Sequence, residues 1–212
     1  MEFNYSNKFN NLISDKNKVR EVLEGSFFHS DDFRKWENAR SFIAKAIHKD
    51  GTILDIGCAN GFLLMCLQEW SGYKLNPYGI DISKRNIGMV RDLFHRIPNH
   101  FASFSVTNIA FPFLGRLIWK HSLKLPQKFD FIYWNVWDNW TFEKPNQVAP
   151  VSSLLNMLNV GGRLILGFYD EKRENNLSRI ETLKTKGYGL NRILENPEGN
   201  EVISWINNEK SS

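Results

Sequence analysis

The sequence predicts an α/β fold in which helices cover both faces of a doubly wound, mostly parallel sheet. Three observations support this prediction. The apolar residues 53–56 end in a glycine turn at 57–61, and a helical pattern follows. Residues 78–82 form a second short apolar run, which ends in an acid, Asp81, and is also followed by a helical pattern. Further apolar runs alternate with helical patterns toward the end of the chain. Strands that are apolar along their whole length indicate a sheet buried on both faces.

Length and composition indicate one globular domain. The chain has 212 residues, of which 42% are hydrophobic and 24% charged. We expect residues 1–30 to be an N-terminal arm, mobile or marginally helical over 1–25. Residues 31–212 are then a single domain with an inserted helical segment near 111–127. The +4 net charge permits contact with nucleic acid, but no dense cluster of Lys and Arg argues for it.

Targeting signals and cysteine usage favour a cytoplasmic protein with no membrane contact. No apolar run is long enough to span a bilayer, and residues 1–20 lack the apolar core of a secretory signal. The two cysteines, Cys58 and Cys66, are too few for a disulfide framework.

The remaining elements follow from periodicity and punctuation. Ser30 is the expected cap of a helix that continues to about Lys49, and Ser83 caps another that Pro98 ends. Gly161 and Gly162 are expected to end a helix that spans 150–159. The other expected segments are strands at 101–106, 129–134 and 163–168, a helix at 175–186, and a strand hairpin at 190–194 and 201–206.

The glycine turn indicates a particular kind of ligand. Glycine lets the backbone bend with positive φ, and the start of the next helix offers unpaired N–H groups. A dinucleotide fingerprint needs glycine where this chain has Ala59 and Phe62, which disfavours a nicotinamide dehydrogenase. With Asp55 before Gly57 and Gly61, the segment resembles the first motif of the class I S-adenosylmethionine-dependent methyltransferases.

A second acid strengthens the resemblance. Asp81 ends the next apolar strand, at the position where a carboxylate holds the ribose hydroxyls. Two acids that each end a strand, with one helix between them, are more specific than either alone. After the third strand, the family often has an Asp facing the adenine amino group. Asn108, between Thr107 and Ile109, is the nearest match, and a turn asparagine is the competing interpretation.

The resemblance covers about residues 30–207 and implies a seven-stranded sheet with one antiparallel strand, formed by the last hairpin. It implies S-adenosyl-L-methionine as the cofactor. The implied cofactor contacts come from the glycine turn and from the ends of the second, third and fourth strands. They are Asp55, Gly57, Cys58, Ala59, Asn60, Gly61, Asp81, Ile82, Thr107, Asn108, Ile109, Asn135 and Val136.

The acceptor side is less specific. Trp134, Trp137 and Trp140 are expected to form a substrate pocket that holds a flat or cationic molecule, although any single tryptophan is more often core. His29 is the candidate catalytic base, with Tyr133 and Asp138 as weaker candidates. The sequence around Asp138 lacks the set of acids that a divalent metal needs, so we expect no metal.

Three hypotheses about function remain open. The leading one is a methyltransferase that acts on a small molecule. An RNA or protein methyltransferase is the second, motivated by the basic charge. The third is a protein that binds the cofactor without catalysis. Residues 135–137 lack the two prolines needed for methylation of base amino groups by the usual route, and no cysteine is placed there for cytosine C5 chemistry.

Overall fold

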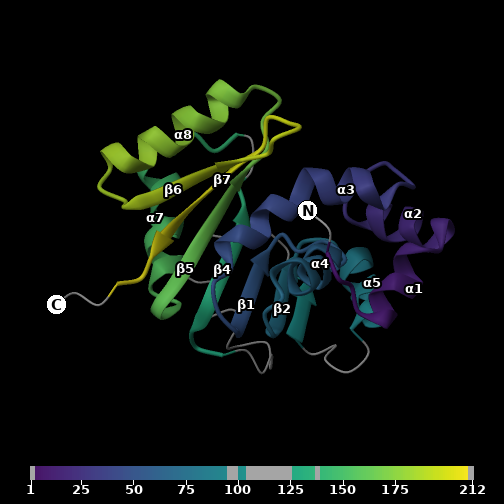
Figure 1. The fold of residues 1–212 in the computed structure, drawn as a ribbon. Helices are drawn as coiled ribbons and strands as arrows, with labels where there is room; N and C mark the ends of the chain where they lie inside the picture. The colour runs from purple at the N-terminus through teal and green to yellow at the C-terminus, as the bar shows by residue number, and fades with distance from the viewer. Residues whose placement is uncertain (1–2, 95–99, 104–125, 137–138, 210–212) are drawn as a thin grey trace.

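The chain folds around one twisted sheet in a computed structural model that describes residues 3–94, 100–103, 126–136 and 139–209 (Figure 1). Among these residues the sheet has seven strands, in the order β3-β2-β1-β4-β5-β7-β6. The strands are β1 (Gly51–Ile56), β2 (Leu75–Asp81), β3 (Phe101–Ser103), β4 (Phe129–Asn135), β5 (Leu158–Phe168), β6 (Leu190–Glu195) and β7 (Val202–Asn207). β7 runs antiparallel to both neighbours, and the other pairs are parallel. The predicted doubly wound sheet with one antiparallel strand is confirmed.

One face of the sheet, here called the α4 face, packs against the helices of the N-terminal half. These are α1 (Asn7–Ile13), α2 (Lys16–Gly25), α3 (Phe33–Arg40), the 3₁₀ helix η1 (Ser41–Ala46), α4 (Phe62–Ser71) and α5 (Lys84–Leu93). Their apolar side chains share one core cluster with Ile53 of β1 and Phe131 of β4. The opposite face, here called the α8 face, packs against α7 (Pro145–Leu155) and α8 (Arg173–Thr185).

Strand pleating assigns alternate residues to the two layers, as expected for a strand buried on both faces. In β5, Ile165 belongs to the core of the α4 face, whereas Leu164 and Leu166 belong to the core of the α8 face. β4 divides in the same way, with Tyr133 on the α4 face and Trp134 on the α8 face. This alternation decides which aromatic side chains reach the site described below.

Residues 7–25 form two packed helices, where we expected an arm that is mobile or marginally helical. Ser6 caps α1 by accepting a hydrogen bond from the Phe9 backbone N–H, and Asp15 caps α2. The Phe9 side chain is buried and stacks on Phe62 of α4, with 6.3 Å between ring centroids. Few but large apolar side chains therefore fix this segment to the domain. The domain boundary at residue 31 stays a prediction.

Several element bounds differ from the predicted ones. The helix expected up to Lys49 divides into α3 and η1, and its cap is Asp32, which accepts from the Arg34 N–H. Pro145 at the first helical position starts α7 earlier than predicted, and α7 ends at Leu155.

Gly161 and Gly162 lie within β5, where we expected them to end a helix. An added Cβ on Gly162 would lie 2.8 Å from the Asp130 carbonyl oxygen, so the strand needs glycine there. Residues 104–106 of the predicted third strand, and 111–125 of the predicted insertion, lie outside the described residues.

Candidate functional site

The sheet changes winding direction between β1 and β4. From β1 the order runs outward through β2 to β3, and from β4 it runs outward through β5 to the hairpin. In open parallel sheets, ligands bind beyond the carboxyl ends of the strands at this point. Asp55, Asp81 and Asn135 lie at the carboxyl ends of β1, β2 and β4. The fold therefore brings three of the predicted site residues to one edge, here called the carboxyl edge.

The glycine turn takes three left-handed residues within five positions. The φ angles are +83° at Gly57, +50° at Ala59 and +78° at Gly61. The backbone N–H groups of Gly57 and Cys58 both donate to the Ile80 carbonyl oxygen, at 2.8 and 3.1 Å. Ala59 carries a Cβ in a conformation that costs a non-glycine residue about 1 kcal/mol or more. The turn accepts this strain because its neighbours hold the backbone in place.

Asp81 is one of those neighbours. Its Oδ2 accepts from the Ala59 N–H at 2.8 Å, and its Oδ1 accepts from the Ser83 N–H at 2.7 Å. The carboxylate thus joins the glycine turn to the start of α5. Each oxygen keeps a further lone-pair direction, and the side chain is 9% exposed. The next residue, Ile82, is 62% exposed and offers an apolar surface beside the acid.

Asp55 is a buried acid near the end of β1. Its side chain is 2% exposed, and no hydrogen bond from the described residues reaches its carboxylate. Burial, and secondarily the negative charge of Asp81, raise its pKa well above the ordinary carboxyl value. Burying an acid that accepts no hydrogen bond destabilises the free protein. We therefore expect a cationic or hydrogen-bond-donating ligand to bind it.

The isolation of Asp55 predicts a pH-dependent cost. With a raised pKa, the folded protein keeps a proton that the unfolded chain has already lost. Stability is therefore fully present below the unfolded pKa of about 3.9 and falls as pH rises through the folded value. Asp55→Asn should remove this slope. At pH 8 and without ligand, the variant should be more stable by about 1–3 kcal/mol in urea unfolding. The control is Asp31→Asn, an exposed acid. A wild type at least as stable as Asp55→Asn at pH 8 would contradict the argument.

The side chains of two turn residues, Asn60 and Cys58, are buried within the protein. The Asn60 side chain is fully buried, its Nδ2 donates to the Val22 carbonyl oxygen, and its Oδ1 accepts from Ser26 and from the Phe62 N–H. The Cys58 thiol packs so close to Gly79 that an added Cβ there would lie 2.6 Å from its sulfur. Burial raises the pKa of the Cys58 thiol, so it is no nucleophile. Only the backbone of these two residues is left to face a ligand.

The described tryptophans of the predicted substrate pocket pack in or against the core of the α8 face. Trp134 is fully buried in the core of the α8 face, where Trp140 packs edge-on against it with 5.2 Å between ring centroids. Trp134 is therefore a core residue and no pocket wall, because strand alternation turns it away from the α4 face. Trp140 is half-buried against that core. Trp137 and Asp138 lie outside the described residues, as do Thr107, Asn108 and Ile109.

A different aromatic group lies beside Asp55. Tyr133 pairs with Asp55 in the register of β4 and β1, and its hydroxyl is hydrogen-bonded to the hydroxyl of Tyr169, just after β5. Gly167 makes room for this contact, since a Cβ there would lie 2.6 Å from the Tyr133 hydroxyl. Burial raises the pKa of both tyrosines, and the charge of Asp55 raises both further. At neutral pH both are hydroxyl donors, which argues against Tyr133 as a base.

Arg40 closes this group from the N-terminal side. Its guanidinium lies 4.4 Å from the centre of the Tyr169 ring and 5.9 Å from that of Phe28, and it pairs with Glu201 at 3.0 Å. Neither Tyr169 nor Arg40 is among the residues predicted from the sequence. Tyr169 directly follows a predicted strand, which was a usable signal, whereas nothing near Arg40 in the chain marks it.

Two of the remaining predicted residues, Asn135 and Val136, lie at the same edge. Asn135 is exposed at the end of β4, and Val136 is buried with its N–H donating to the Gly167 carbonyl oxygen. His29 is exposed in the segment between α2 and α3. Among the described residues, no group of His, Cys, Asp and Glu could hold a metal ion. That the site uses no metal stays a prediction.

The comparison with protein families identifies the chain. Residues 28–165 match the family model described as "Methyltransferase domain". The chain is a methyltransferase of this family. The match includes the glycine turn, both acids and the first four strands, and a search of curated proteins finds no match. The resemblance to S-adenosylmethionine-dependent methyltransferases is thereby confirmed.

Solved structures share the fold of this methyltransferase at low identity. An S-adenosylmethionine-dependent methyltransferase from Aquifex aeolicus is 15% identical with a TM-score of 0.54, over 91% of this chain and 97% of the other. The N-methyltransferase NodS from Bradyrhizobium japonicum is 16% identical with a TM-score of 0.54, over 84% and 97%. Fibrillarin from Aeropyrum pernix, solved with bound S-adenosyl-L-methionine, is 17% identical with a TM-score of 0.53, over 81% and 76%.

The cofactor of this methyltransferase is S-adenosyl-L-methionine. The residues at the carboxyl edge fit it chemically. The cofactor carries a sulfonium and an ammonium, and Asp55 is a buried acid without a partner among the described residues. No helix in the described part of the chain is long and apolar enough to cross a membrane.

Proposed function

We propose that the enzyme transfers a methyl group from S-adenosylmethionine to a small-molecule acceptor at the carboxyl edge. The observation that carries the proposal is the pair of buried acids at the ends of β1 and β2. Among the described residues, Asp81 is held by two backbone N–H groups and Asp55 by none. The pair supplies one positioned hydrogen-bond acceptor and one buried site for a cation.

Each part of the cofactor has a matching group. The Asp55 carboxylate faces the ammonium, and the free lone pairs of Asp81 accept from the ribose hydroxyls. Ile82 packs against the adenine with its exposed side chain. Gly57, Cys58, Ala59, Asn60 and Gly61 contribute backbone. Beyond them we place Asn135 and Val136, with Thr107, Asn108 and Ile109 assigned from the sequence alone. The bound cofactor supplies the activated methyl group, and the protein aligns the acceptor with it.

The acceptor side lies where Tyr133 and Tyr169 meet. A hydrogen-bonded hydroxyl pair has one proton left to donate, and the surrounding Phe28 and Arg40 make one wall aromatic and cationic. Such walls suit a flat acceptor with a hydrogen-bond acceptor group. Tyr133 and Tyr169 therefore replace Trp134 as the proposed lining, with Trp137 and Trp140 kept from the sequence prediction. His29 remains the candidate base, as an exposed imidazole.

A nucleic acid is the second candidate acceptor. The observation that favours it is a pair of arginines on the α4 face, Arg163 and Arg192, with Lys45 exposed on the adjoining helix η1. A protein is the third candidate acceptor, and binding of the cofactor without turnover is the fourth hypothesis. The cytoplasmic location stays a prediction.

Calorimetric titration with S-adenosylmethionine and then with S-adenosylhomocysteine tests the proposal first. We expect micromolar binding of both, because the acids and the turn contact parts that the two molecules share. An acceptor screen with labelled methyl groups should then show turnover with a small aromatic acceptor. Absence of binding in folded protein would reduce the acids to structural roles. Labelling of RNA or protein alone would identify a macromolecular acceptor instead.

A further inference from the structure

Two arginines lie on the α4 face of the C-terminal part of the sheet. In the strand register Ile165 pairs with Trp205, and Trp205 pairs with Arg192, so these side chains share one face. Arg163 precedes Ile165 by two positions and therefore points to the same side. Ile165 and Trp205 belong to the core of the α4 face, which fixes the face. Arg163 and Arg192 thus flank one tryptophan, from β5 and β6.

Arg163 is held in place, but most of its hydrogen-bond donors have no partner among the described residues. Its Nη1 donates to the Ala46 carbonyl oxygen at 2.7 Å, and its guanidinium lies 5.0 Å from the centre of the Trp205 ring. A guanidinium has five N–H donors, and this is the one hydrogen bond that Arg163 makes to the described residues. The ring and the carbonyl fix its direction and leave donors for a ligand.

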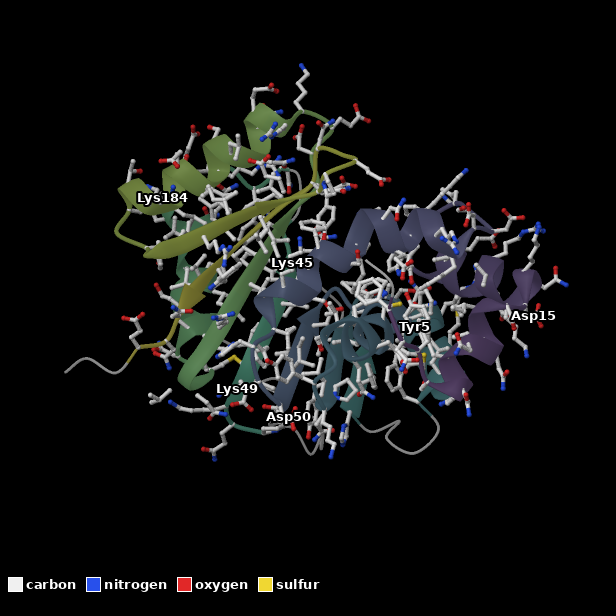
Figure 2. All side chains as sticks on the ribbon, in the orientation of Figure 1. Tyr5, Asp15, Lys45, Lys49, Asp50 and Lys184 are labelled. Atoms are coloured by element: carbon white, nitrogen blue, oxygen red, sulfur yellow. The ribbon has the colours of Figure 1, made fainter. Side chains whose placement is uncertain are left out.

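A third cation joins from the other layer. Lys45, labelled in Figure 2, is exposed on η1 and directly precedes Ala46, whose carbonyl oxygen accepts from Arg163. Arg192 is also exposed. Among the described residues, no carboxylate forms an ion pair with Lys45, Arg163 or Arg192. Three acids on neighbouring elements are engaged elsewhere: Asp130 binds Lys49 at 3.0 Å, Glu209 accepts from Asn207, and Glu198, which lines the same pocket as Lys45, accepts from Asn38.

The crowding of like charges is unfavourable in the free protein. Burial, and then the charge of Arg192, lower the pKa of Arg163. The described part of the chain pairs neither Arg163 nor Arg192 with an acid, whereas it pairs Arg40, Arg173 and Arg179 with acids. An anion from outside would relieve the repulsion.

We propose that Arg163, Arg192 and Lys45 bind a phosphate group of a ligand. One arginine side chain can donate to both oxygens of a carboxylate. A phosphate presents more acceptor oxygens and up to two negative charges. Two arginines that flank one tryptophan, with Lys45 on the adjoining helix η1, match that larger demand. The inference does not rest on the proposed small-molecule acceptor.

The distance to the carboxyl edge separates two sources of phosphate. Phe168 follows Arg163 by five positions on β5, which is about 17 Å along a strand. A nucleic-acid strand could occupy both places at once, and a small phosphorylated molecule could not. The probes are therefore inorganic phosphate, by calorimetry, and a fluorescein-labelled single-stranded oligoribonucleotide, by anisotropy.

The test variants are Arg192→Gln and Lys45→Gln, because both side chains are exposed and their loss should leave the fold intact. Arg163→Gln is measured with them, with thermal unfolding to detect damage from the lost Ala46 contact. The matched control is Lys172→Gln with Lys184→Gln, which removes two cations from the start and end of α8 on the opposite face. S-adenosylmethionine affinity is measured in every variant.

Whichever probe binds the wild type should bind the double variant Arg192→Gln with Lys45→Gln about tenfold more weakly. The same probe should keep its affinity for the control variant. S-adenosylmethionine binding should not change, so failure here is distinct from failure of the methyltransferase proposal. If inorganic phosphate binds and the oligonucleotide binds no more tightly than phosphate, the ligand is a small phosphorylated molecule. If the oligonucleotide binds more tightly than phosphate, the ligand is a nucleic acid. Binding of neither probe, or equal loss in the control, would overturn the site.

Discussion

Asp81→Ala should weaken S-adenosylmethionine binding by about 1.5–3 kcal/mol, which is roughly a 10- to 150-fold increase in Kd. The variant removes an acceptor for the ribose hydroxyls. It also frees the N–H groups of Ala59 and Ser83, which the carboxylate now holds at 2.8 and 2.7 Å. Ala59 then loses the contact that stabilises its left-handed backbone, so the glycine turn loosens where the cofactor binds. Calorimetry at constant pH measures the change in Kd.

Asp81→Asn separates the two roles of the side chain. An amide keeps one oxygen for a backbone N–H but presents an NH₂ group to the other, so the turn is only partly held. We expect its affinity to lie between wild type and Asp81→Ala. Asp31→Ala is the matched control, since Asp31 is exposed on the N-terminal side. Unchanged affinity in a folded Asp81→Ala protein would remove Asp81 from the ribose site.

The arrangement of the proposed cofactor residues was predictable because its signals are local. An acid within an apolar run, two glycines four residues apart and a second acid after the next strand all lie within 27 residues of sequence, 55–81. Strand ends in a parallel sheet meet at one edge, so the meeting of Asp55 with Asp81 follows from the fold class. Ala59 was also interpretable, since the structure gives it the positive φ expected of the glycine it replaces.

The acceptor half depends on contacts that are distant in sequence. Counting aromatic residues favoured 133–142, but strand alternation places Tyr133 on the α4 face and Trp134 in the opposite core. The packing of α3 and η1 decides which face of the sheet the site lies on. Arg40 and Tyr169 meet across 129 positions (169 − 40) at 4.4 Å, a contact that no sequence spacing reveals.

The N-terminal helices show the same limit on a larger scale. Residues 1–25 have few apolar residues, and their composition favours disorder. Phe9, Val19 and Leu23 are nevertheless buried, because the glycine turn and α4 present Phe62 and Asn60 to them. Part of the surface that orders the segment, at Asn60 and Phe62, begins 35 residues after α2 ends (60 − 25).

Asn60→Ala should lower the free energy of unfolding by about 2–4 kcal/mol, because three groups lose their partner at once. They are the Val22 carbonyl, the Ser26 hydroxyl and the Phe62 N–H, at 2.8, 2.7 and 3.1 Å. Urea unfolding measures the change. Asn11→Ala, at an exposed position of α1, should stay within about 0.5 kcal/mol of wild type.

A double-mutant cycle with Ser26→Ala tests whether Asn60 couples the N-terminal helices to the cofactor turn. Ser26→Ala alone should cost about 1 kcal/mol, and much less once Asn60 is alanine, because the two side chains share one hydrogen bond. S-adenosylmethionine affinity should fall in Asn60→Ala, since its Oδ1 fixes the Phe62 N–H at the start of α4. Additive losses, with cofactor affinity intact, would mean that the helices only cover the core. Coupled losses would make residues 7–25 part of the machinery that shapes the turn.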